Sequence, residues 1–179
     1  MEKTNTNLLA PCGLYCGVCR VYIAHRDNNL KFKQELLPIY KAYGAKNVDD
    51  IACTSCLSDG IKFPFCRTCS IKECIKDKDI EGCRQCDEYP CNDLKEFQAA
   101  GAHRFELWVS HEQIVEMGYE KWMEEMKEYY SCSNCKTINS AYDFQCRSCG
   151  HEPSNQYLAK HGKEILKFLA NQQAQLKKE

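Results

Sequence analysis

Eight of the fifteen cysteines lie between Cys53 and Cys91, where their spacing repeats. Segments 66–74 and 83–91 both read C-R-x-C-x4-C, and a further C-x-x-C pair stands ahead of them. Two thiolates three residues apart can bind one metal ion from a single tight turn. The pattern therefore predicts metal binding, with the candidate ligands Cys53, Cys56, Cys66, Cys69, Cys74, Cys83, Cys86 and Cys91.

Another group of cysteines comes earlier in the chain, where Cys12, Cys16 and Cys19 have C-x3-C-x2-C spacing. Gly13 and Gly17 each follow a cysteine, where a metal knuckle often needs a residue that accepts a positive φ. Radical S-adenosylmethionine enzymes hold an iron–sulfur cluster with the same spacing of cysteines. They enclose their substrate in a partial α/β barrel, which is commonly on the order of the size of a full barrel, about 250 residues. Only 160 residues follow Cys19, so we favour a metal knuckle that is completed from further along the chain.

The last four cysteines form the most specific motif of the sequence. Cys132-x2-Cys135 is followed, ten residues later, by Cys146-x2-Cys149. This spacing is typical of a zinc ribbon, in which two knuckles face each other across short β-hairpins. We therefore predict a four-thiolate zinc site, with Gly150 at the positive-φ position of the second knuckle and Lys136 at the equivalent place in the first.

The compartment decides the chemistry of the cysteines. The first residues lack the apolar core of a secretion signal, and the sequence has no apolar run of the roughly 18 residues that indicate a membrane span. We therefore expect a cytoplasmic protein without contact to a membrane, in which thiols do not persist as disulfides. An odd number of cysteines also argues against a full set of internal disulfides.

The eleven cysteines before residue 92 leave their pairing open. Four C-x-x-C pairs supply the ligands of two tetrahedral sites. Cys12, Cys74 and Cys91 are then one ligand short of a third site, which His25 or an outside ligand would complete; the alternative is two structural zinc ions and leftover thiols. Thiolates accept zinc and iron alike, so zinc is the expected metal and an iron–sulfur cluster in the N-terminal half is the alternative.

The segments between the cysteines must position them. Apolar periodicity predicts helices over 29–43, with Pro38 inside, over 92–100, over 110–130 with a break near Gly118, and over 153–176, while the apolar residues of 105–109 alternate. Residues 45–91 have too little periodicity to hold together without metal. The predicted fold is small, metal-stabilised and mainly α, with an irregular cysteine-knuckle core, a C-terminal zinc ribbon of short β-hairpins and a terminal helix. The expected units are a cysteine-rich metal-binding domain (1–103), a helical connector (104–130), the ribbon (131–152) and the C-terminal helix (153–179).

Charge and motifs narrow the function. The formal net charge is −1, and deprotonated thiol ligands make the metal-bound protein more acidic, so generic binding to duplex nucleic acid is not expected. Six glutamates between residues 112 and 128 are best interpreted as a solvated helix face. Because no nucleophile–base motif is present, we expect a non-catalytic module that binds another macromolecule, most simply a protein. The alternatives are an iron–sulfur redox or sensor protein and, third, a nucleic-acid-binding ribbon protein, for which Lys136 and Arg147 offer little basic surface.

The order of the motifs resembles a known family. Cys12-Gly13-Leu14-x-Cys16-x2-Cys19 precedes a C-x2-C pair and the doubled C-x2-C-x4-C, which ends in Tyr89-Pro90-Cys91. This order is similar to that of an uncharacterised prokaryotic family catalogued as domain of unknown function 3795. The resemblance covers about residues 9–100, with eleven cysteines in register, and a tryptophan-containing helix and terminal ribbon resemble its longer members. The family has no established activity, so the resemblance implies metal binding and no particular reaction.

Overall fold

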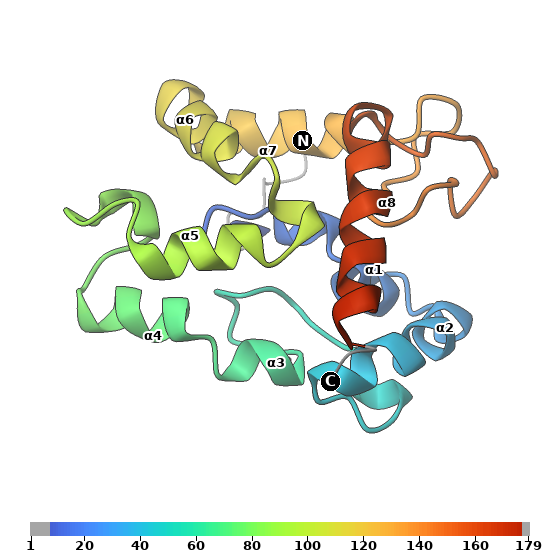
Figure 1. The fold of residues 1–179 in the computed structure, drawn as a ribbon, viewed down its shortest axis with the longest axis horizontal. Coiled ribbons are helices and arrows are strands. Elements are labelled where there is room, and N and C mark those ends of the chain that lie inside the picture. Colours follow the sequence, from blue (N-terminus) through green and yellow to red (C-terminus); the bar gives the residue numbers. More distant parts are fainter. Residues whose placement is uncertain (1–7, 177–179) are drawn as a thin grey trace.

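The structure is a computed structural model that describes residues 8–176 of the chain. Figure 1 shows mostly short helices and one long one, α8, joined by irregular connections. The α-helices are α1 (Arg20–Arg26), α2 (Leu30–Tyr40), α3 (Pro64–Arg67), α4 (Ser70–Asp77), α5 (Asn92–Ala99), α6 (Leu107–Met117), α7 (Tyr119–Tyr129) and α8 (Gln156–Leu176). Single 3-10 turns lie at η2 (Cys16–Val18), η3 (Lys41–Tyr43), η4 (Val48–Asp50), η5 (Cys83–Gln85) and η6 (Ala102–Arg104).

Local sequence signals set several of the helix ends. The side chain of Asn29 accepts a hydrogen bond from the backbone N–H of Phe32 at 3.0 Å and so caps the start of α2. Gly44 ends the η3 turn after α2 in the left-handed region, with φ +90°. Gly118, with φ +81°, separates α6 from α7 at the break predicted from the sequence. None of the helices in the described part of the chain combines the length and apolar character that a bilayer span requires.

The β-hairpins predicted for the C-terminal ribbon are wrong. Residues 8–176 contain no strand, and two isolated antiparallel bridges, Leu9 with Tyr15 and Ser131 with Ile138, are the only β pairing there. The backbone of residues 131–155 closes into tight turns around its own cysteines, so few N–H and C=O groups are left for a ladder. The chain then continues as α8, as Figure 1 shows for the loop between α7 and α8.

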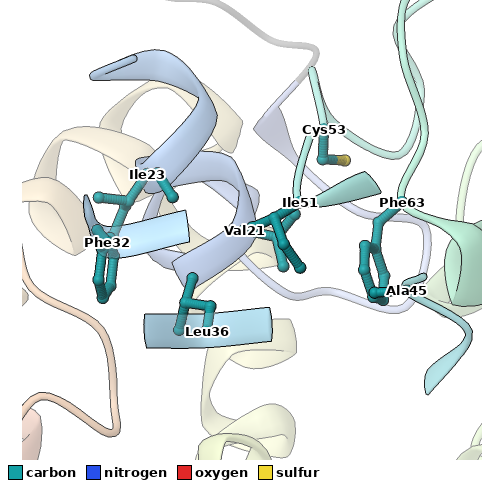
Figure 2. Close-up of a cluster of buried hydrophobic side chains, with 9 residues drawn as sticks. Val21, Ile23, Phe32, Leu36, Ala45, Ile51, Cys53 and Phe63 are labelled. Carbon is teal, nitrogen blue, oxygen red and sulfur yellow. The ribbon is translucent and has the colours of Figure 1, made fainter. Parts of the chain in front are cut away.

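One apolar cluster joins α1, α2 and the segment that leads into the central cysteines. Val21, Ile23 and Leu36 are almost fully buried there and pack with Ile51 and Phe63 (Figure 2). Cys53 belongs to the same cluster, and Cys66 packs against it from outside. The helical N-terminal pair thus provides the support on which the first central cysteines rest.

Two further clusters connect distant parts of the chain. One contains Ala102, Tyr130, Ala141 and Tyr157, so each of the four predicted units contributes at least one residue to it. The other surrounds Cys12 and draws side chains from α4, α5 and α6, including Leu94, Leu107 and Ile71 at its centre. The division into four units stays a prediction, although these segments share buried side chains.

Candidate metal centre

Four cysteines of the loop between α7 and α8 come together in space. The Sγ atoms of Cys132, Cys135, Cys146 and Cys149 all lie within 4.8 Å of one another. Cys132 Sγ is 3.7 Å from Cys149 Sγ, and Cys135 Sγ is 3.5 Å from Cys146 Sγ. Tetrahedral coordination with metal–sulfur bonds of about 2.3 Å places sulfur atoms about 3.8 Å apart. The four thiols can therefore hold one metal ion with little rearrangement.

Each half of this centre is a short turn with a left-handed residue after its second cysteine. The N–H of Lys136 donates to the carbonyl of Cys132 at 2.9 Å, and the N–H of Gly150 donates to that of Cys146 at the same distance. Their φ angles are +61° for Lys136 and +72° for Gly150, which confirms the prediction for both positions. The turns hold the backbone so that both cysteine side chains face the same point.

Two asparagine side chains each approach one of the sulfur atoms. The Nδ2 atom of Asn139 lies 3.5 Å from Cys146 Sγ, and that of Asn134 lies 3.5 Å from Cys149 Sγ. Asn139 is fully buried, and its Oδ1 accepts a hydrogen bond from the backbone N–H of Arg147 at 3.0 Å. N–H groups directed at sulfur favour the thiolate and orient it for a metal. Nothing in the sequence distinguished these residues, because the cysteine spacing does not show which side chains will face the sulfur atoms.

The ionisation of the four thiols is uneven. Hydrogen bonds with the side chain and backbone of Thr137 lower the pKa of Cys135 to about 6, and its Sγ is 3.3 Å from Thr137 Oγ1. Burial raises the pKa of Cys132 to about 11. Burial also opposes ionisation of Cys146, but hydrogen bonds from the backbone of Cys149 and Ser148 and from Asn139 lower its pKa overall. Cys135 would thus offer a metal ion a ready thiolate, whereas Cys132 would have to lose a proton to bind it.

A buried carboxylate ties the centre to the N-terminal half. Asp143 Oδ1 is 3.1 Å from Arg20 Nε on α1, and its Oδ2 is 3.4 Å from Arg147 Nε. Neither Nε–H is aligned for a hydrogen bond, so the contacts are ion pairs only. Asp143 also accepts from the N–H of Ser140 at 2.8 Å. Because α1 follows directly on Cys19, this carboxylate connects the C-terminal loop to the first cysteine group.

The eleven N-terminal cysteines are distributed differently. Within residues 8–176 no other set of three or more His, Cys, Asp or Glu ligand atoms gathers within 4.8 Å. Cys12 is buried in one apolar cluster, and packed around that cluster are Cys16, Cys56, Cys69, Cys83 and Cys91. Cys19 lies at the start of α1 and is exposed, while Cys53 and Cys66 belong to the cluster of α1 and α2.

Within this N-terminal group, Cys16 and Cys56 are direct neighbours. Their side-chain hydrogen bond raises the pKa of Cys16 and lowers that of Cys56 to about 7. These two residues belong to different C-x-x-C pairs, which agrees with knuckles that face each other. Cys74, Cys83, Cys86 and Cys91 instead line one cavity. The pairing of the eleven ligands with metals stays a prediction.

One buried histidine, which no sequence motif indicated, connects two cysteine groups. His111 on α6 has Nε2 at 2.9 Å from the carbonyl oxygen of Cys12 and Nδ1 at 2.7 Å from the hydroxyl of Tyr89. Burial lowers the pKa of His111, so the neutral ring bridges the first knuckle and the second repeat. Gly13 has φ +85°, as predicted, whereas Gly17 lies in η2 without a positive φ.

Comparison with known proteins agrees with the cysteine register. Residues 8–96 match the family described as "Protein of unknown function (DUF3795)". The chain belongs to this family through that segment. No curated protein and no solved structure matches the chain. The match spans the eleven N-terminal cysteines, while the compact four-cysteine centre lies beyond it.

Proposed function

We propose that this protein is a zinc-stabilised, non-catalytic module whose surface binds another protein in a reducing cytoplasm. The observation that carries the proposal is the compact set Cys132, Cys135, Cys146 and Cys149, whose sulfur spacing suits one tetrahedral ion. Zinc fits because all four donors are thiolates and no position is left open for a substrate, as is usual in structural zinc sites. Metal binding then contributes directly to the free energy of folding.

The position of the centre gives the metal a structural task. After the second knuckle, Asn155 Oδ1 accepts a hydrogen bond from the N–H of Leu158 at 2.9 Å and caps α8. The hydroxyl of Tyr157 then donates to the carbonyl of Ala102 at 2.5 Å, which anchors the helix in the core. An ion that fixes both knuckles fixes the path from α7 into α8, and so the shared core depends on it.

The surface favours a protein partner over nucleic acid. Tyr43 and Phe65 are both about half exposed, and their rings are in edge contact with centroids 5.7 Å apart. Paired aromatic side chains of this kind are common in protein interfaces. The two cations that the ribbon motif offers are already paired: Lys136 with Glu128 at 2.9 Å, and Arg147 with Asp143. These pairs leave little positive charge for phosphate groups.

Metal analysis of the full chain tests this proposal. We expect Cys146→Ser to remove about one zinc ion per chain, because a tetrahedral site loses a ligand. The circular dichroism signal of helices should fall and protease cleavage near α8 should rise. Ser148→Ala is the matched control, because it alters the same turn but keeps the backbone N–H beside Cys146. Equal zinc content and equal protease resistance in Cys146→Ser and Ser148→Ala would contradict the proposal.

A further inference from the structure

A second group of four cysteines surrounds a cavity near the opposite end of the molecule. The cavity has a volume of about 230 Å3. Its sulfur donors come from four short stretches: Cys74 from α4, Cys83 from the start of η5, Cys86 from the residue after η5, and Cys91 from the residue before α5. Figure 1 shows the connection from α4 to α5 at one end of the long axis and the loop between α7 and α8 at the other.

This group is wider than the C-terminal centre. No three of its sulfur atoms lie within 4.8 Å of one another, since within residues 8–176 only the C-terminal cysteines form such a set. One tetrahedral ion would need sulfur atoms about 3.8 Å apart. The cavity that they line is also many times larger than the roughly 10 to 15 Å3 that one water molecule needs on the same measure. The arrangement of the four sulfur atoms therefore suits a polynuclear metal cluster better than a single metal ion.

The lining of the cavity includes a cation and apolar side chains, both of which stabilise an anionic iron–sulfur cluster. Lys78 Nζ lies 3.3 Å from Cys86 Sγ, so an ammonium N–H donates to one of the sulfur atoms. Its second partner is Glu88 at 2.9 Å, which holds the lysine over the cavity. Ile75, Ile80 and Leu94 form apolar walls. Hydrogen bonds to sulfur and the exclusion of water are the protein's main means of stabilising an iron–sulfur cluster and setting its reduction potential.

We propose that Cys74, Cys83, Cys86 and Cys91 bind a 4Fe–4S cluster. Cys74 is the last cysteine of the first C-x2-C-x4-C repeat, and the other three make up the whole second repeat. The first repeat thus donates its last cysteine to the centre of the second. Two-cluster ferredoxins exchange ligands between neighbouring motifs in a comparable way. This set differs from the sequence-based pairing, which placed Cys83 and Cys86 apart from Cys74 and Cys91.

The direct test measures iron, acid-labile sulfide and zinc in the full chain purified without oxygen. We expect about four iron and about four sulfide ions per chain with a brown colour. Cys74→Ser and Cys91→Ser should lose colour, iron and sulfide and keep the C-terminal zinc. Cys135→Ser is the matched control and should lose zinc but keep the iron. A colourless protein that contains only zinc, or iron that persists fully in both Cys74→Ser and Cys91→Ser, would overturn the assignment.

A variant that keeps all fifteen thiols guards against misfolding. Lys78→Gln removes the ammonium group beside Cys86, so the reduced, more negative cluster is less stabilised and the reduction potential should fall. Lys76→Gln is the control, because it makes the same charge change on the exposed surface of α4, outside the cavity lining. We expect unchanged iron content in both variants and a clear potential shift in Lys78→Gln alone. Equal shifts in the two variants would place the cluster elsewhere.

Discussion

Replacement of Gly13 by alanine should be unusually costly, because two separate effects meet at this residue. Its φ of +85° lies in the left-handed region, where a side chain costs about 1 to 2 kcal/mol. A Cβ atom would also come within 2.0 Å of Nε2 of His111. The histidine must therefore move away from the carbonyl of Cys12 and the hydroxyl of Tyr89, at about 1 kcal/mol for each hydrogen bond. We expect Gly13→Ala to lower the free energy of unfolding by about 3 to 4 kcal/mol.

Gly150→Ala is the matched control for this prediction. Gly150 also follows a knuckle cysteine with a positive φ, of +72°, but no atom lies within 4 Å of its added Cβ. It should therefore cost only the backbone contribution, about 1 to 2 kcal/mol. Urea unfolding of the full chain, followed by circular dichroism at measured metal content, gives both values. Equal losses in the two variants would refute the role assigned to the histidine.

A double-mutant cycle separates the two effects further. His111→Ala removes the ring that the new Cβ would strike, at the price of its own hydrogen bonds. In that background Gly13→Ala should cost only about 1 to 2 kcal/mol, as for an open left-handed site. Full additivity of the two substitutions would show that the cost of Gly13→Ala arises from the backbone alone.

Three further outcomes follow from charged and titrating groups. Asp143→Asn keeps the shape of the side chain but removes the charge between Arg20 and Arg147, so it should lower the free energy of unfolding by about 3 kcal/mol. A loss below about 1 kcal/mol in urea unfolding would contradict this expectation. Burial lowers the pKa of His103 to about 3, so below about pH 6.5 the unfolded chain takes up a proton that the folded one does not. Stability should therefore fall by about 2 kcal/mol between pH 7 and pH 5 through this residue alone, and the fall should be smaller by that amount in His103→Gln. In metal-free protein, the alkylation of Cys135 should slow as the pH falls through about 6, and Thr137→Val should slow it at pH 7. If mass spectrometry showed that Cys132 reacts faster than Cys135, the lower pKa of Cys135 would be contradicted.

Short-range features could be predicted from the sequence because they depend on residues that are close in the chain. The C-x-x-C spacing placed Cys132 beside Cys135 and Cys146 beside Cys149, since one turn suffices to bring two such thiols together. The left-handed positions after them were predictable for the same reason. The break at Gly118 followed from the lack of a side chain and from the change of apolar period around it.

Where the prediction failed, contacts that the cysteine spacing does not show decided the outcome. Gly17 was expected to need a positive φ, but it lies in η2. A side chain there would collide with the ring of Tyr15, which comes within 2.4 Å of the Cβ position. The ribbon hairpins did not form because residues 131–155 use their backbone groups in turns and in contacts with side chains such as Asn139. A pattern of spacings contains no information on such competition for hydrogen bonds.

The composition and the cysteine spacing are enough to predict a protein rich in thiols that lie in short turns and can bind metal. Which of these turns meet in space depends on how distant segments pack. Ile71 of α4 and Leu94 of α5 share a buried cluster beside the cavity that Cys74 lines together with the second repeat, and His111 joins residues that lie 99 and 22 positions away in the chain. Such contacts depend on the burial of apolar side chains from distant segments, and this burial follows from the whole fold and not from local spacing.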